Sequence, residues 1–148
     1  MTTSDPCDLK RFIDAQEGVY ESALAELRNG QKRSHWMWFI FPQIDGLGMS
    51  ETSKFFSIKS IEEARQYLAH PVLGSHLKEC SRAVLGVEGR SALQIFGSPD
   101  DLKLNSSMTL FTSINSGDSI FQQVLDKYYH GKKDSRTLEI LEHLGEKN

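Results

Sequence analysis

Cysteine and long apolar runs are both scarce in this sequence. Only two cysteines, Cys7 and Cys80, occur among 148 residues, which excludes a disulfide-rich secreted scaffold. The longest aromatic and aliphatic run, residues 36–41, is far shorter than the roughly 20 residues that a membrane-spanning helix needs. The N-terminus also lacks the basic and then apolar pattern of a secretory signal. We therefore expect a cytoplasmic protein with two reduced thiols and no membrane association.

An excess of positive charge is also missing. The sequence has 17 lysines and arginines against 20 acidic residues, a formal net charge of -3. Nucleic-acid-binding domains usually carry a basic excess, so we expect no nucleic-acid partner. The length and the 39% hydrophobic content are typical of one globular domain with its own core. We predict a short tail over residues 1–7 and a single all-α domain over residues 8–144.

The signatures of several common enzyme classes do not occur. The sequence contains no G-x-S-x-G, no phosphate-binding loop, no H-E-x-x-H and no C-x-x-C. The glycine-containing loop at residues 43–50 is not a dinucleotide fingerprint, because Glu51 stands where the third glycine would be. The five histidines are not spaced as metal ligands. We predict no metal and no cofactor, and the sequence leaves open whether the protein is an enzyme.

Helical periodicity and helix-start signals are abundant. Apolar residues at helical spacing predict one long first helix from Asp8 to Arg28, and Gln16 is a polar amide on its inward row. Ser34 can cap a short helix through Phe41, for which a strand is the alternative. The other expected helices begin near serines, prolines or acidic residues and are the segments 60–69, 71–86, 91–96, 98–111, 118–130 and 135–144.

The most distinctive stretch runs from His35 to Gln43 and contains both tryptophans. Indole rings suit a ligand-pocket wall as well as a core. His35 is the candidate proton carrier, because imidazole titrates near neutral pH, although it could simply form a hydrogen bond at a helix start. Asp45, in the following glycine loop, is the candidate proton acceptor. We predict His35 and Asp45 as catalytic residues.

Other side chains are candidates for holding a polar ligand. Gln43 and a hydroxyl cluster could orient it, while lysines could hold a phosphate or carboxylate group. The run of Asn105, Ser106, Ser107 and Thr109 is unusual in a helix interior, because such side chains compete for backbone hydrogen bonds. The predicted ligand-binding residues are Gln16, Lys32, Trp36, Trp38, Gln43, Lys103, Ser106, Ser107 and Thr109.

These motifs together resemble an uncharacterised family, domain of unknown function 1810. The residues that carry the resemblance are Phe12, Ala15-Gln16, Tyr20, Ala23-Leu24, Glu26-Leu27, Gly30, the segments 35–43 and 46–48, His70-Pro71-Val72-Leu73-Gly74, Ile95-Phe96-Gly97, and the segments 101–104, 106–111 and 134–138. The resemblance implies a mainly α-helical single domain and no established activity. Family members are sometimes labelled calpastatin, a disordered and proline-rich inhibitor, which does not fit a chain with 4 prolines and a patterned core.

The leading functional hypothesis is a pocket between residues 35–43 and 106–109 that binds a small polar or nucleotide-like ligand, with hydrolytic or N-glycosidic chemistry. The Ala15-Gln16 pair is also similar to small N-glycosidases, whose chemistry needs a carboxylate beside the departing sugar. Asp14, Glu17 and Asp45 could supply it. The alternative is a non-catalytic interaction module, in which the tryptophan segment lies wholly in the core and the surface from Lys127 to Arg136 meets a protein partner.

Overall fold

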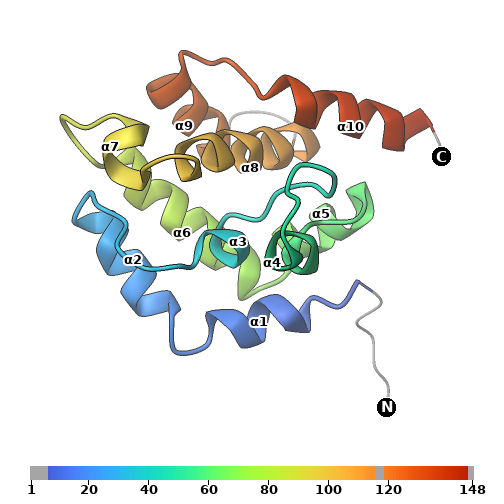
Figure 1. Ribbon diagram of the computed structural model, residues 1–148, viewed down its shortest axis with the longest axis horizontal. Coiled ribbons are helices and arrows are strands. Elements are labelled where there is room, and N and C mark those ends of the chain that lie inside the picture. Colours follow the sequence, from blue (N-terminus) through green and yellow to red (C-terminus); the bar gives the residue numbers. More distant parts are fainter. Residues whose placement is uncertain (1–6, 116–118, 147–148) are drawn as a thin grey trace.

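Helices form the whole framework of the computed structural model, which describes residues 7–115 and 119–146 (Figure 1). The predicted tail therefore lies outside the described residues, except for Cys7. The helices in these ranges are α1 (Lys10–Gln16), α2 (Tyr20–Arg28), α3 (Met37–Ile40), α4 (Glu51–Phe56), α5 (Ile61–Ala69), α6 (Leu73–Leu85), α7 (Ala92–Phe96), α8 (Asp100–Ile114), α9 (Ile120–Tyr129) and α10 (Ser135–Glu146).

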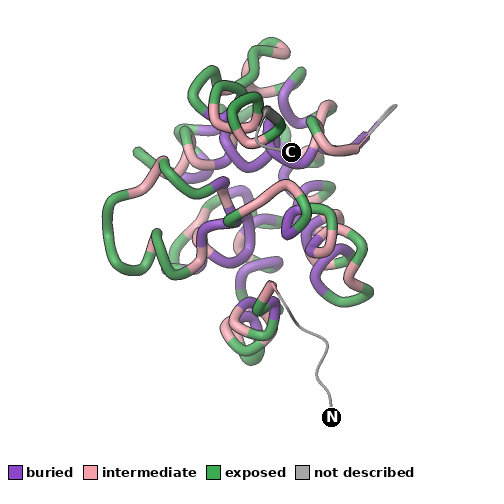
Figure 2. Tube along the Cα trace, turned by 90° about the vertical axis from the view of Figure 1, so that its right-hand side faces the viewer, coloured by how far each residue is buried: buried purple, intermediate pink, exposed green. Residues whose placement is uncertain are grey.

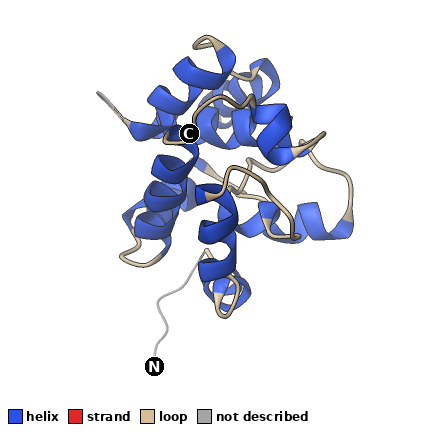
Figure 3. Ribbon diagram, turned by 90° about the vertical axis from the view of Figure 1, so that its left-hand side faces the viewer, coloured by secondary structure: helices blue, strands red, loops and turns tan. Residues whose placement is uncertain are grey.

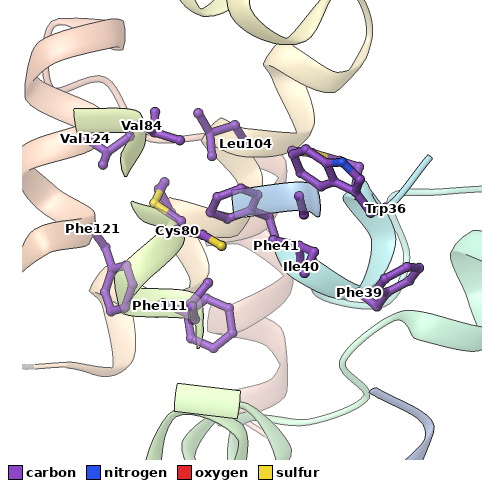
Figure 4. Close-up of a cluster of buried hydrophobic side chains, with 14 of the residues drawn as sticks. Trp36, Phe39, Ile40, Phe41, Cys80, Val84, Leu104, Phe111, Phe121 and Val124 are labelled. Atoms are coloured by element: carbon purple, nitrogen blue, oxygen red, sulfur yellow. The ribbon is translucent and has the colours of Figure 1, made fainter. Parts of the chain in front are cut away.

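The core is shared by α6 and the helices around it. α6 packs against α2, α5 and α9, and α8 packs against α9, α10, α5 and α7. Figure 4 shows Ile40 of α3 and the adjoining Phe41 on the side that faces the core residues of α6, α8 and α9, whereas Phe39 points away from them. The labelled core residues are Trp36, Phe39, Ile40, Phe41, Cys80, Val84, Leu104, Phe111, Phe121 and Val124. The aromatic segment thus supplies one wall of the hydrophobic core.

The first predicted helix is wrong in one respect, because it is two helices. α1 ends at Gln16, and Gly18 adopts a φ of 77° before α2 begins at Tyr20. This left-handed conformation is open to glycine at little cost and breaks the helical hydrogen bonding. The break lets α2 leave α1 in a new direction.

The second predicted helix is shorter than expected. α3 covers only Met37–Ile40, which confirms a helix rather than a strand for the aromatic segment. Ser34 does not cap it, because its hydroxyl donates to Glu26 instead. A further helix, α4, was not predicted. It begins after Ser50, whose hydroxyl oxygen accepts a hydrogen bond from the Ser53 N–H.

Most of the other predicted starts are close to the observed ones. Ser91 forms a complete capping box with Gln94 at the start of α7. Ser60 caps α5, but the Glu63 carboxylate accepts from the Lys59 N–H and pairs with Arg11 rather than completing a box. The N-cap position of α8 is Pro99 rather than Ser98. α9 begins at Ile120, and the predicted start at residue 118 lies outside the described residues.

Buried positions lie on the inward sides of the helices and exposed positions on their outer sides (Figure 2). Figure 3 shows helices and loops and no strand among the described residues, with a single isolated parallel bridge between Ile44 and Ile58. The predicted all-α fold is confirmed. None of the described helices combines the length and the apolar character that crossing a membrane requires.

Gly74 allows α5 and α6 to approach closely. A Cβ atom at this position would lie 2.1 Å from the carbonyl oxygen of Leu68. We expect Gly74→Ala to lower the free energy of unfolding by about 1–3 kcal/mol, because backbone must move to make room. Gly145→Ala on α10 is the control, since its added Cβ would meet no atom within 4 Å. Urea unfolding of both variants checks this, and equal stability of the two would contradict it.

Candidate functional site

A cleft of about 350 Å³ opens where α1, α2 and α6 meet. Gly18 lies at its edge, so the turn between α1 and α2 that was not predicted helps to form it. The other lining residues combine apolar, acidic and aromatic side chains, and they are Ile13, Gln16, Glu17, Tyr20, Glu21, Val72 and His76. This volume lies at the lower end of the range for small-molecule sites, about 300–1,000 Å³.

The floor of the cleft is a chain of hydrogen bonds around the buried amide of Gln16. Its Nε2 donates to the carbonyl oxygen of Phe39 at 2.7 Å and to the hydroxyl of Tyr67 at 3.2 Å. A carbonyl can only accept, so the atom facing Phe39 is the amide nitrogen. The Oε1 atom therefore faces His76, whose Nδ1 lies 2.6 Å away.

This contact determines which nitrogen of His76 carries the proton. Because Oε1 of Gln16 is an acceptor, Nδ1 of His76 must be the donor. Burial lowers the pKa of His76 below its usual 6.5, although Glu79 and Glu21 act in the opposite direction. The ring is therefore neutral at neutral pH, and its Nε2 carries a lone pair. Nε2 has no hydrogen-bond partner among the described residues, so it can accept a proton or a hydrogen bond.

The Tyr20 ring packs against one face of the His76 ring. The two rings stack with centroids 3.5 Å apart and an angle of 11° between their planes. The Tyr20 hydroxyl donates to Glu79, which also pairs with Arg28 at 3.4 Å. Burial and the hydrogen bond to Glu79 raise the pKa of Tyr20, so this hydroxyl keeps its proton. His76 is thus fixed by a hydrogen bond at Nδ1 and by a ring against its face.

The tryptophan segment is held by one carboxylate, that of Glu26. It accepts hydrogen bonds from the N–H groups of Arg33 and Ser34, from the Ser34 hydroxyl and from Trp36 Nε1, at 2.6 to 3.0 Å. Trp36 is fully buried. Burial alone would raise the pKa of Glu26, but these hydrogen bonds lower it to about 2. Trp36 therefore has a structural contact for its only polar atom.

Two of the predicted lysines lie against the two tryptophans. The Nζ of Lys32 lies 5.2 Å from the Trp36 ring centroid, and that of Lys103 lies 5.4 Å from the Trp38 ring centroid. Both ammonium groups also approach Asp100, at 2.9 Å for Lys32 and 3.6 Å for Lys103. The structure brings these four predicted residues together at the start of α8, with an aspartate already between the lysines.

Trp38 and Gln43 share a much smaller cavity. It has a volume of about 10 Å³, close to the minimum for one water molecule. The Nε1 of Trp38 is buried and has no hydrogen-bond partner within the described residues. Gln43 is half-buried beside it. An indole N–H facing a space of this size would suit a single bridging water.

The hydroxyl cluster of α8 faces α10 and its preceding loop. Ser106 donates to the Leu102 carbonyl and to Asp134, and Thr109 accepts from the Asp134 N–H at 2.9 Å. Ser107 is fully buried, and its hydroxyl has no partner among the described residues. Ser106 and Thr109 thus make contacts that hold α8 to the start of α10.

The two predicted catalytic residues, His35 and Asp45, are both exposed. Within the described residues, no hydrogen bond or ion pair joins one to the other. His35 precedes the buried Trp36. Asp45 accepts from the Ser57 hydroxyl at 2.7 Å and lies 3.5 Å from Lys59. The pocket predicted between residues 35–43 and 106–109 stays a prediction.

The sequence indicated Gln16 as a candidate ligand-binding residue but gave no indication of its partner His76. These residues are 60 positions apart, and their contact depends on how α1 packs beside α6. One signal was present, because Gly18 interrupts the apolar row that contains Gln16 and Tyr20. A glycine inside a helical pattern, beside an inward amide, indicates a turn next to a polar site.

The fold and the cleft together define a small all-helical domain with a partly polar pocket. The chain belongs to the family described as protein of unknown function DUF1810, whose model matches residues 6–141. The chain is also similar to the conserved hypothetical protein Rv1873 from Mycobacterium tuberculosis, whose crystal structure it matches with 53% identity and a TM-score of 0.92. The match covers 93% of this chain and 99% of that one. None of the curated proteins matches the sequence. The predicted family and fold are confirmed, and these comparisons name no activity.

The low pKa of Glu26 predicts a pH-dependent contribution to stability. Its folded-state pKa of about 2 lies below the ordinary 4.5, so its contribution is complete above that ordinary value and is lost as the pH falls toward 2. We expect Glu26→Gln to cost about 1–3 kcal/mol at neutral pH and much less near pH 2. Urea unfolding at both pH values measures this. The exposed Glu142→Gln variant is the control, and an equal loss at both pH values would contradict the assignment.

Proposed function

We propose that this protein binds a small polar ligand in the cleft between α1, α2 and α6. The observation that supports this most strongly is the 2.6 Å contact between Gln16 Oε1 and His76 Nδ1, which leaves the lone pair of Nε2 available at a cleft wall. A ligand site typically combines apolar walls with a few fixed polar groups. Ile13 and Val72 supply apolar surface here, and His76 is held in one orientation and one protonation state.

The same groups favour a hydrolytic reaction as an extension of binding. A neutral imidazole nitrogen can act as a general base near neutral pH, and the cleft places carboxylates around it. Of the three carboxylates considered for N-glycosidic chemistry, Glu17 lines the cleft. Asp14 instead pairs with Lys10 at 2.8 Å, and Asp45 pairs with Lys59. Glu17 is therefore the residue through which that chemistry would be tested.

The second candidate function is a non-catalytic interaction module, which the exposed basic residues Lys132, Lys133 and Arg136 favour. Lys127, by contrast, donates to the Leu85 and Val87 carbonyl oxygens at the end of α6 and so has a structural role. A cytoplasmic location, as predicted from the sequence, fits either candidate.

A thermal-shift screen tests ligand binding directly. The panel contains nucleotides, ADP-ribose, sugar phosphates, flavin precursors and simple amines. A ligand at a hundred times its dissociation constant stabilises by about 2.7 kcal/mol, which is roughly 5–10 °C for a domain of this size. We expect a shift that is lost in His76→Ala and retained in His35→Ala, because His35 lies outside this cleft.

Val72→Trp is a second variant that tests whether the ligand binds in this cleft, and it replaces His76→Ala if that variant is unstable. Val72 is 44% exposed, so a larger side chain there should obstruct the cleft with little effect on folding. A shift lost in His35→Ala but retained in both cleft variants would move the site to the tryptophan segment. No shift with any compound would favour the interaction module.

A further inference from the structure

The side-chain groups that the cleft offers to a ligand are hydrogen-bond acceptors. Glu17 and Glu21 contribute carboxylates, and His76 contributes the lone pair of Nε2. Among the described residues that line the cleft there is no lysine and no arginine. The side chains that are available to a ligand are therefore all hydrogen-bond acceptors, two of them negatively charged.

The side-chain donors in the cleft wall are already used inside the protein. The amide nitrogen of Gln16 donates to Phe39 and Tyr67, and the hydroxyl of Tyr20 donates to Glu79. The Nδ1 proton of His76 is held by Gln16. A ligand that needs donors, such as a phosphate or a carboxylate, would find none of these available and would meet two like charges.

We infer that the ligand of this cleft is a small organic cation, an amine or an amidinium attached to an apolar body. Its N–H groups would face Glu17, Glu21 and the Nε2 atom of His76, and its apolar part would lie on Ile13 and Val72. This inference rests on the proposed function and narrows it, because it disfavours the phosphate-bearing members of the nucleotide-like class.

The Tyr20 ring forms an apolar part of the cleft wall. One face of the ring is covered by His76 and the residue is only 7% exposed, so the ring supplies packing surface for the apolar body of the ligand. Tyr20 lines the cleft and is held in place by its stack with His76 and its hydrogen bond to Glu79. The volume of about 350 Å³ suits a ligand with one ring or a short chain.

Cation binding should weaken in acid, because a protonated His76 would lose its acceptor and gain a like charge. The groups around the His76 ring are Gln16 and Glu17 from α1, Tyr20 and Glu21 from α2, and Glu79 from α6. Glu79 also forms an ion pair with Arg28. Arg28 is the one cation in this set of described groups, and its charge is paired with that of Glu79. Below the His76 pKa, which burial sets lower than 6.5, affinity should fall.

Three probes with one ring and different charges test this: benzamidine, benzamide and benzoate. Titration calorimetry on the full chain should show binding of benzamidine, weaker binding of benzamide and no binding of benzoate. Glu21→Gln should weaken benzamidine about three- to tenfold and leave benzamide unchanged. Glu142→Gln changes net charge equally on exposed α10 and should have no effect. Added salt should weaken benzamidine binding.

The outcomes separate this inference from the proposed function. Binding of benzoate or benzamide as tight as that of benzamidine, or equal benzamidine affinity in Glu21→Gln, would overturn the cation preference. A phosphate-bearing hit from the broader screen that depends on His76 would also overturn it, while leaving the proposed function in place. Absence of any His76-dependent shift in the screen, together with absence of benzamidine binding in the calorimetry, would overturn both.

Discussion

The buried amide of Gln16 is the contact on which the arrangement of the first half of the chain depends. A buried amide without partners would cost about 1–3 kcal/mol or more, so its neighbours must supply both a carbonyl and a donor. Phe39 of α3 and Tyr67 of α5 satisfy the nitrogen, and His76 of α6 satisfies the oxygen. Four helices are thereby joined at one side chain. The cleft forms beside it because Gly18 turns the chain immediately after α1.

Other buried or half-buried carboxylates play a similar organising role. Glu26 collects the N–H groups of the loop before α3, and Glu63 pairs with the nearly buried Arg11 at 2.6 Å while accepting from the Lys59 N–H. Glu26 therefore joins the loop before α3 to α2, and Glu63 joins both α1 and the residue before Ser60 to α5. Charge-assisted hydrogen bonds of this kind are stronger than neutral ones, which suits loops that have few backbone contacts of their own.

Much of the fold follows from local patterns, whereas the site depends on long-range contacts. Helix-start signals at Ser60 and Ser91 predicted α5 and α7, because capping involves residues three positions apart. The aromatic segment is the most distinctive stretch of the sequence, but its pattern left open whether it forms core or pocket wall, and the structure places Trp36 in the core. The pairing of Gln16 with His76 spans 60 positions and includes a backbone carbonyl from a third segment, which no periodicity encodes. α4 was not predicted, because its apolar residues are few.

The thiol of Cys80 lies on α6 one helical turn after His76 and is fully buried. Burial raises its pKa to about 12, so almost none of it is thiolate at neutral pH. A thiol reagent can reach this sulfur only when the packing around α6 opens. The rate at which Cys80 is alkylated therefore measures how often the packing around α6, the helix that carries His76, opens. Molecules that bind in the neighbouring cleft would slow the alkylation of Cys80, so the alkylation rate would report whether the cleft is occupied.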